Sequence, residues 1–322
     1  MNQLHPLLSV SDLKKHFYIK KGFGEVQVLK AVDGVSFQLS AGEVLGVVGE
    51  SGCGKTTLGR TVLRLYDPTS GVIFFDGKDV CHLPDAALRK MRGRMQIIFQ
   101  DPYSSLNPRM TVGKMLNQIM HSHEVMDSSE REKRCVDTME KVGLEPAHLK
   151  RFPHEFSGGQ RQRIAIARAL ILYPRLIVAD EPSSALDMSI QAQILNLMKL
   201  LQKEMNIAYL FITHNLSAAR FLCDRIAVMY LGKVVELATR TQLFEHPCHP
   251  YTKALLPLCP IHDPDSRVEQ VPLKGEVPSP VNPPDGCRFH PRCPEAKEAC
   301  SHHGPELVEI EPGHQVACHL FT

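Results

Sequence analysis

The chain has 322 residues, of which 43% are hydrophobic and 22% charged, and its formal net charge is +2 at pH 7. This composition is ordinary for a globular protein, and the small net charge gives no argument for binding of nucleic acid through bulk charge. No apolar run reaches the length of a membrane span, and residues 1–6 lack the charged and apolar regions of a signal peptide. We therefore expect a cytosolic protein with one large domain or two unequal ones, which would reach a membrane only through a partner.

Apolar runs in chain order predict the strands of an α/β fold. Strands are expected at residues 26–39, 42–48, 71–77 (a strand with its turn), 97–99, 176–179 and 208–212, and a hairpin at 225–237. A helix should follow Lys55 and run to Leu65, ahead of Asp67-Pro68. Residues 190–203 are helical between two strands, which implies a parallel sheet, whereas the N-terminal β elements are antiparallel.

The middle and the end of the chain differ from this pattern. Residues 111–150 have a polar helical pattern with a capped helix start at residues 128–132, so we expect a helical subdomain at about 105–172. Residues 278–284 are too rich in proline for regular structure. The predicted organisation is a large α/β domain at 1–250 and a small, irregular, cysteine-containing extension at 251–322.

The motif G-x-x-x-x-G-K-[ST], a P-loop, is complete at residues 49–56, between a predicted strand and a predicted helix. Its glycines let the backbone wrap around phosphates, Lys55 should reach the β- and γ-phosphate oxygens, and the Thr56 hydroxyl should bind Mg²⁺. The alternative is a glycine turn without a ligand. The expected nucleotide-binding residues are Gly49, Ser51, Gly52, Cys53, Gly54, Lys55, Thr56 and Thr57.

Polar residues follow three of the predicted core strands, where open α/β sheets bind their ligands. Asp180 should support Mg²⁺ directly or through water, and Glu181 should orient or deprotonate the attacking water. His214 is placed to contact the γ-phosphate. Gln100 is placed to touch Mg²⁺ or the water, and the loop after it could convey the nucleotide state to the helical subdomain.

A second set of phosphate-binding groups precedes the helix that starts near residue 158. Ser157, Gly158, Gly159 and Gln160 would present a hydroxyl and backbone N–H groups at a helix N-terminus. Two such sets in one chain are explained if two chains close face to face, each completing the site of the other. Residues 184–187, ending in Asp187, should face the partner chain. Phe17 or Tyr18 could stack on adenine, and spacing alone does not choose between them.

These motifs together resemble the ATP-binding subunits of ABC transporters, over roughly residues 7–260. The resemblance implies a head-to-tail dimer in which Ser157 and Gly159 of one subunit contact the γ-phosphate bound by Lys55 of the other. ATP closes such a dimer and hydrolysis opens it. The resemblance also assigns adenine stacking to Phe17, with Tyr18 as the alternative, and the D-loop role to Asp187.

Three further segments, residues 99–109, 249–256 and 275–280, look like the dipeptide/oligopeptide importer group. This resemblance implies an ATP-hydrolysing motor at the cytoplasmic face of the bacterial inner membrane. Its partners would be two permease subunits, a second, different ATPase subunit and an external solute-binding protein. Importers of nickel and other solutes share the pattern. A soluble ABC ATPase acting on ribosomes or DNA is a further alternative, disfavoured by the single P-loop, and a P-loop kinase would leave residues 157–160 unexplained.

The ten cysteines fall into two groups. Six are scattered and are expected to be inert: Cys53, Cys81, Cys135, Cys223, Cys248 and Cys259. The other four, Cys287, Cys293, Cys300 and Cys318, are spaced x5, x6 and x17, and four thiolates can hold a [4Fe–4S] cluster or Zn²⁺. Tight C-x₂₋₄-C pairs typical of zinc are absent, and resemblance to the importer tail favours the cluster; free thiols are the third alternative. A metal here would be structural, because the extension buries little core.

Overall fold

The computed structural model describes residues 6–21, 25–123, 127–258 and 275–321, and Cys259 lies outside them. The chain forms two compact units, and strand β8 (Ala208–Thr213) runs from one into the other. Unit 1 consists of Met1–Leu39, Val44–Cys81 and Ile212–Thr322, and unit 2 consists of Ser40–Glu43 and His82–Phe211.

Within the described residues, no helix combines the length and the apolar character that crossing a bilayer requires.

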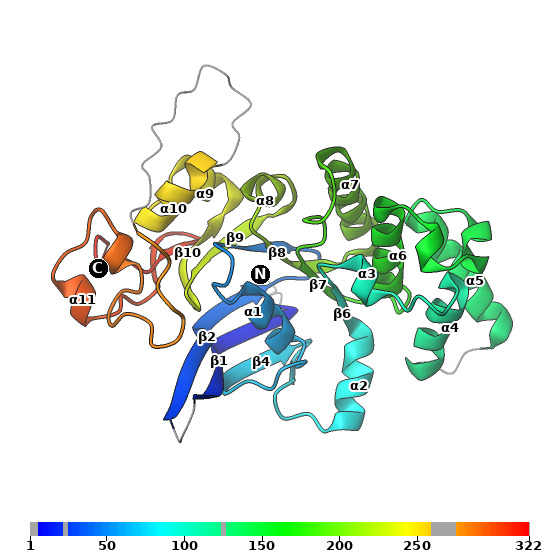
Figure 1. Ribbon diagram of the computed structural model, residues 1–322, viewed down its shortest axis with the longest axis horizontal. Helices are drawn as coiled ribbons and strands as arrows, with labels where there is room; N and C mark the ends of the chain where they lie inside the picture. The colour runs from blue at the N-terminus through cyan, green and yellow to red at the C-terminus, as the bar shows by residue number, and fades with distance from the viewer. Residues whose placement is uncertain (1–5, 22–24, 124–126, 259–274, 322) are drawn as a thin grey trace, which may run out of the picture. The chain divides into compact units, whose positions relative to one another are not determined.

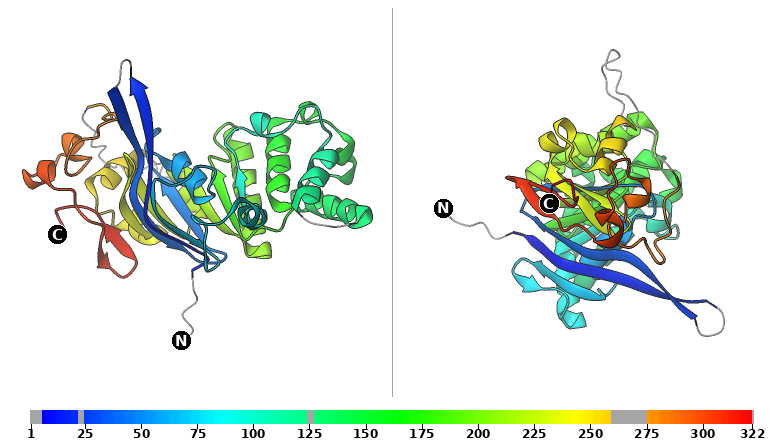
Figure 2. Two further views of the ribbon diagram at one scale, coloured as in Figure 1. Left: turned by 90° about the horizontal axis from the view of Figure 1, so that it is seen from below. Right: turned by 90° about the vertical axis from the view of Figure 1, so that its left-hand side faces the viewer.

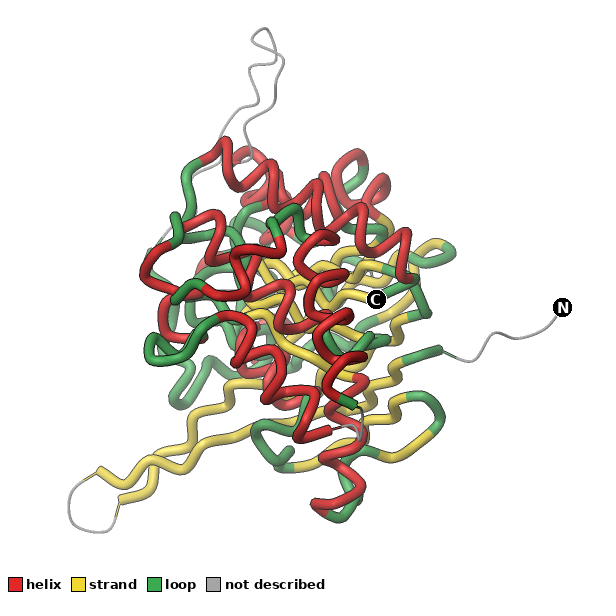
Figure 3. The backbone as a smooth tube through the Cα atoms, turned by 90° about the vertical axis from the view of Figure 1, so that its right-hand side faces the viewer, coloured by secondary structure: helices red, strands yellow, loops and turns green. Residues whose placement is uncertain are grey.

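The first sheet of unit 1 has four antiparallel strands in the order β2-β1-β4-β5. The antiparallel pairing was predicted from the sequence, whereas strand β1 was not. The strands are β1 (Leu8–Lys21), β2 (Glu25–Leu39), β4 (Ser70–Phe75) and β5 (Lys78–Asp79). Strand β1 pairs with β4 only from Leu8 to Lys14, whereas its pairing with β2 continues to Lys21. The outer half of β1–β2 is therefore a two-stranded ribbon, drawn yellow in Figure 3 and blue in Figure 2.

The second sheet of unit 1 is mixed and contains the strand that precedes the P-loop. Strand β3 (Val44–Val48) is parallel to β9 (Arg225–Tyr230), and β9 is antiparallel to β10 (Lys233–Thr239). All five residues of β3 are buried, which explains its uninterrupted apolar run. Helices of this unit are α1 (Lys55–Val62), α8 (Leu216–Leu222), α9 (Arg240–Glu245), α10 (Pro250–Leu255) and α11 (Ala299–His302).

The C-terminal extension contains more regular structure than its sequence indicated. Besides α10 and α11 it has the 3₁₀ turns η3 (Leu256–Leu258) and η4 (His290–Arg292), and the hairpin β11 (Val308–Glu311)–β12 (His314–Val316). Strand β12 pairs with β10, so the extension adds two strands to the mixed sheet. Val316 and Phe289 are buried, and the extension therefore shares a core with the strands of unit 1.

Unit 2 combines a parallel strand pair with the predicted helical subdomain. Strands β6 (Met95–Ile98) and β7 (Leu176–Asp180) are parallel neighbours. Helices α4, α5 and α6 lie side by side in Figure 1, where α6 is the one that follows the Ser-Gly-Gly-Gln motif. The helices and turns are α2 (Asp85–Arg94), α3 (Pro102–Ser105), α4 (Val112–His123), α5 (Ser128–Lys141), η1 (Pro146–Lys150), η2 (Pro153–Glu155), α6 (Gly158–Leu170) and α7 (Met188–Met205).

Two helix boundaries differ from those expected. Helix α1 ends at Val62 rather than Leu65, because Arg64 has a left-handed backbone with φ 50° that stops the helix. The cap of α5 is Asp127, one residue before the expected Ser128, and its carboxylate accepts a hydrogen bond from the Glu130 N–H at 2.8 Å.

Candidate nucleotide-binding site

The P-loop of unit 1 joins the buried strand β3 to helix α1. Gly54 is the N-cap residue of α1, with φ 105°, and a Cβ at this position would collide with the Ala31 carbonyl. Only glycine adopts this positive φ without strain and also lacks the Cβ that would collide. Because Gly54 has no side chain that could cap the helix, the first turn of α1 offers its backbone N–H groups to a ligand, as an anion site requires.

Lys55 is buried within the loop that it belongs to, with 5% of its surface exposed. Its Nζ donates hydrogen bonds to the carbonyl oxygens of Gly49 at 2.7 Å and Glu50 at 2.8 Å. A buried ammonium group requires such partners. The loop carbonyls thus hold the lysine that the motif assigns to the phosphates.

Two residues of the C-terminal extension contact the P-loop, and the sequence analysis missed both. The Glu50 N–H donates to Tyr251 Oη at 3.0 Å. Arg292 donates from its two terminal nitrogens to the two oxygens of Glu50, at 2.8 and 3.1 Å. Separations of 201 and 242 residues leave no local signal for either contact, although Arg292 lies one position before a cysteine that the sequence singled out.

In unit 2, the parallel pairing of β6 and β7 brings two of the predicted catalytic residues together. Asp180 is the last residue of β7 and is buried, and Glu181 follows it with φ 47°. The Gln100 side-chain amide donates to Glu181 Oε2 at 3.2 Å. The Glu181 carboxylate, held by the Gln100 amide at the carboxyl end of two parallel strands, is in a suitable place to orient a water molecule.

The Ser-Gly-Gly-Gln motif begins helix α6 with a reciprocal capping box. The Gln160 N–H donates to Ser157 Oγ at 3.3 Å, and the Ser157 N–H donates to Gln160 Oε1 at 3.1 Å. Helix α7 packs against this turn, since a Cβ added to Gly159 would lie 2.8 Å from Ile190 Cγ2. Asp187 caps α7 by accepting from the Ile190 N–H at 3.0 Å. The Ser-Gly-Gly-Gln motif, here called the signature motif, and Asp187 of the predicted D-loop are therefore neighbours.

The remaining predicted residues lie in unit 1. His214 is exposed immediately after β8. Phe17 packs edge-on against Tyr66 with 5.6 Å between the ring centroids, and Lys15 Nζ lies 5.0 Å from the Phe17 centroid. Tyr18, on the other side of the strand, is 66% exposed. Phe17 is thus the aromatic residue that belongs to a structured cluster.

The four cysteines of the extension line one small cavity. Burial raises the pKa of the Cys287 and Cys318 thiols and raises that of Cys293 to about 11, so these three are protonated thiols at neutral pH. No three of the four sulfurs lie within 4.8 Å of one another in the described part of the chain. A single tetrahedral zinc would hold sulfurs about 3.8 Å apart.

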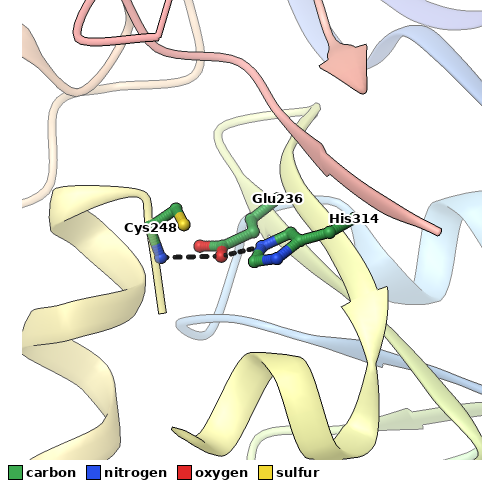
Figure 4. Close-up of side chains that lie close together, drawn as sticks. All are labelled: Glu236, Cys248 and His314. Carbon is green, nitrogen blue, oxygen red and sulfur yellow. Dashed lines mark hydrogen bonds and ion pairs between the residues drawn. The ribbon is translucent and has the colours of Figure 1, made fainter. Parts of the chain in front are cut away.

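Glu236, Cys248 and His314 form a second cluster, and their potential metal-ligand atoms do lie within 4.8 Å of one another (Figure 4). Glu236 Oε1 is 2.8 Å from His314 Nε2 and accepts from the Cys248 N–H at 2.9 Å, while Oε2 accepts from the His249 N–H at 2.9 Å. Both carboxylate oxygens of Glu236 are therefore satisfied, with Glu236 and His314 buried and Cys248 half-buried. We interpret this cluster as a structural connection between β10, β12 and the segment before α10.

Comparison with known proteins gives two family matches and close relatives. The ABC transporter model matches residues 32–184, and the model of the oligopeptide/dipeptide transporter C-terminal region matches residues 235–300. The oligopeptide transport ATP-binding protein AppF of Bacillus subtilis (strain 168) is 52% identical over 321 residues, which cover 98% of each chain.

Solved structures agree with these matches. The cbiO1 protein of Clostridium perfringens, part of the ABC transporter complex cbiONQ, superposes with a TM-score of 0.64 at 28% identity, covering 75% of this chain and 91% of that one. The ATP-binding cassette MJ0796, in a dimeric post-hydrolysis state with ADP and Pi, superposes with a TM-score of 0.63 at 31% identity, covering 72% and 98%.

The chain is therefore an ABC-type ATPase, as its motifs indicated. It belongs to the ABC transporter family, and its C-terminal region is of the oligopeptide/dipeptide transporter type.

Proposed function

We propose that this chain is the ATP-hydrolysing motor subunit of a bacterial importer of di- or oligopeptides. The observation that carries the proposal is a complete P-loop with a buried Lys55, in a chain 52% identical to an oligopeptide transport ATP-binding protein. The match of residues 235–300 to an oligopeptide/dipeptide transporter region supports the peptide class over nickel or other solutes.

The proposed roles in hydrolysis follow the chemistry of each side chain. Lys55 binds the β- and γ-phosphate oxygens, and Thr56, Asp180 and Gln100 support Mg²⁺. Glu181 orients and deprotonates the attacking water, aided by its hydrogen bond from Gln100. His214 contacts the γ-phosphate. The backbone of residues 49–57 surrounds the phosphates, and Phe17 stacks on adenine.

We further propose that Ser157, Gly158, Gly159 and Gln160 act on a nucleotide bound by another subunit, with Asp187 at the same interface. The dimeric, ADP-bound state of the similar cassette MJ0796 supports this arrangement. The partner would be a second, homologous ATPase subunit. In a complete importer this pair would work with two permease subunits and an external solute-binding protein, at the cytoplasmic face of the inner membrane, and without nucleic acid.

The cysteine-lined cavity is proposed to hold a [4Fe–4S] cluster, with Zn²⁺ as the alternative. Cys287, Cys293, Cys300 and Cys318 would be its ligands, and the group would crosslink four points of the extension. Because burial keeps thiols of this cavity protonated, loading would release protons and would weaken as pH falls. Anaerobic purification, visible absorbance and iron analysis test this, and a colourless protein with stoichiometric zinc would contradict the cluster.

The test of the motor function is Glu181→Gln in the complex with its permeases and partner ATPase. Loss of the base should reduce ATP turnover by about 10²- to 10³-fold. ATP binding should survive, so the variant should retain unhydrolysed ATP, measured as nucleotide that co-purifies with the complex. Glu204→Gln on the exposed end of α7 is the matched control. Turnover at the wild-type rate would refute the role of Glu181, and peptide uptake in cells lacking the gene tests the substrate class.

A further inference from the structure

Glu50, the second residue of the P-loop, is held on three sides. Its carbonyl accepts from Lys55, its N–H donates to Tyr251, and its carboxylate receives both terminal nitrogens of Arg292. Only the first of these contacts is local to the loop. The other two come from residues 251 and 292, so the C-terminal extension fixes both the backbone and the side chain of a P-loop residue.

The Arg292–Glu50 pair is a strong interaction by its geometry and its surroundings. It is bidentate, which is the strongest arrangement of an arginine and a carboxylate. The Arg292 side chain is 7% exposed and that of Glu50 25% exposed, so water screens the pair weakly. Removal of one partner would leave the other as an uncompensated charge in a largely dehydrated place.

Arg292 belongs to the segment that carries two of the clustered cysteines. Residues 287–293, here called the cysteine segment, begin and end with a cysteine and contain turn η4. Arg288, at the start of this segment, donates to Asp33 and to the Leu231 carbonyl. The Cys287 N–H donates to the Cys300 carbonyl at 2.8 Å. The segment is thus anchored at one end and holds Glu50 at the other.

A second connection runs from the same segment through aromatic rings. Phe289 packs against Tyr251 with 5.3 Å between the centroids, and Tyr230 contacts both rings, at 5.3 and 4.7 Å. All three rings are fully buried. Since the Tyr251 hydroxyl accepts from the Glu50 N–H, a movement of Phe289 would displace Tyr251 and, through it, the backbone of Glu50. A movement of Arg292 would instead displace the side chain of Glu50.

From these contacts we propose that the cysteine segment sets the ATP affinity of the P-loop in the same chain, with Arg292 as a positioning residue that acts through Glu50. This rests on the proposed binding of ATP at the P-loop. Arg292 neutralises a carboxylate within a loop that must accept a polyphosphate anion, and it fixes the residue whose carbonyl holds Lys55. A disturbed cysteine segment, whether by loss of a bound metal or by thiol oxidation, would release Glu50 and weaken ATP binding. By linkage, bound ATP would stabilise the cysteine segment.

The test is a mutant cycle on the full chain, read as the dissociation constant of a fluorescent ATP analogue. Arg292→Met should weaken binding about tenfold, because it leaves the Glu50 charge unpaired. Glu50→Gln removes the charge but keeps a side-chain oxygen that can accept from Arg292, so it should change binding by less than about threefold, and it should restore most of the loss when combined with Arg292→Met. Arg292→Lys keeps the charge and should lie between the wild type and Arg292→Met. Lys203→Met removes an exposed positive charge of α7 and is the matched control.

Cys293→Ser tests whether the cysteine segment influences ATP affinity through Arg292 and Glu50. It should weaken binding in the wild-type chain but not in the Glu50→Gln/Arg292→Met double variant, where the connection is already broken. Thermal unfolding without nucleotide identifies variants that fail to fold.

Three results would overturn the proposal. The first is that Arg292→Met folds and binds the ATP analogue with an affinity within twofold of wild type. The second is that Glu50→Gln does not restore the affinity lost in Arg292→Met. The third is that Cys293→Ser does not change the affinity. Wild-type protein that binds no ATP analogue would instead refute the proposed function.

Discussion

The two glycine-rich helix starts, α1 and α6, satisfy their first-turn N–H groups in opposite ways. Helix α1 begins at Gly54, which provides no side-chain cap, and the cation beside it is bonded to loop carbonyls. Helix α6 begins at Ser157, which forms a reciprocal capping box with Gln160. The first N-terminus leaves its N–H groups for a ligand, whereas the second is capped by its own sequence.

This difference indicates how each surface meets a phosphate. The P-loop is open to an anion and is supported from outside by Tyr251 and Arg292. The signature turn is held by contacts within unit 2, namely its own cap and its packing on Ile190. A preorganised turn loses little entropy on contact with a nucleotide held by another subunit. Variants at the two starts should therefore fail in different assays.

The largest expected effect is at the open start. Lys55→Ala removes the buried cation and leaves two loop carbonyls without their donor, so the affinity of the isolated chain for an ATP analogue should fall by about 100-fold or more. Lys203→Ala, at an exposed position of α7, is the control and should bind normally. Affinity within threefold of wild type for Lys55→Ala would mean that the P-loop is not the nucleotide site.

An intermediate effect is expected from Gly159→Ala at the capped start. The new Cβ would lie 2.8 Å from Ile190 Cγ2, so α6 or α7 must shift. ATP hydrolysis by the assembled ATPase pair should fall at least about tenfold, while ATP binding by the isolated chain stays unchanged. In Gly158→Ala the Cβ would lie 3.5 Å from Leu186, and the loss should be smaller. Weakened binding in the isolated Gly159→Ala chain would remove the distinction between the two starts.

The smallest effect concerns the cap itself. Ser157→Ala removes one half of the capping box and should lower the free energy of unfolding by about 1 kcal/mol. Urea denaturation monitored by circular dichroism measures the change. Ser129→Ala, in the first turn of α5 but not its cap, should change stability by less than about 0.5 kcal/mol. If both variants behaved alike, Ser157 would not be the structural cap that its geometry indicates.

Local features of the site were predictable from the sequence, and long-range ones were not. The apolar run before Gly49 and the Ser157 start of α6 are encoded within a few residues, and both were predicted correctly. The end of α1 was misplaced because the left-handed conformation of Arg64 has no local marker. The hairpin β11–β12 was missed because its strands are short and alternate with polar residues. The hydrogen bonds that Tyr251 and Arg292 form with Glu50 could not be predicted, since only the folded core brings these residues together.

The discontinuity of unit 1 has a consequence for biosynthesis. Strand β3 pairs with β9, so Leu45 can pair with Arg225 only after the ribosome has added 180 further residues. Tyr251 and Arg292 are synthesised later still. Unit 2 is continuous apart from Ser40–Glu43 and can fold while the rest is being made. A prematurely terminated chain would then present a folded α6 together with a P-loop that lacks the contacts of Tyr251 and Arg292, so the full affinity for ATP is reached only after both residues have been made.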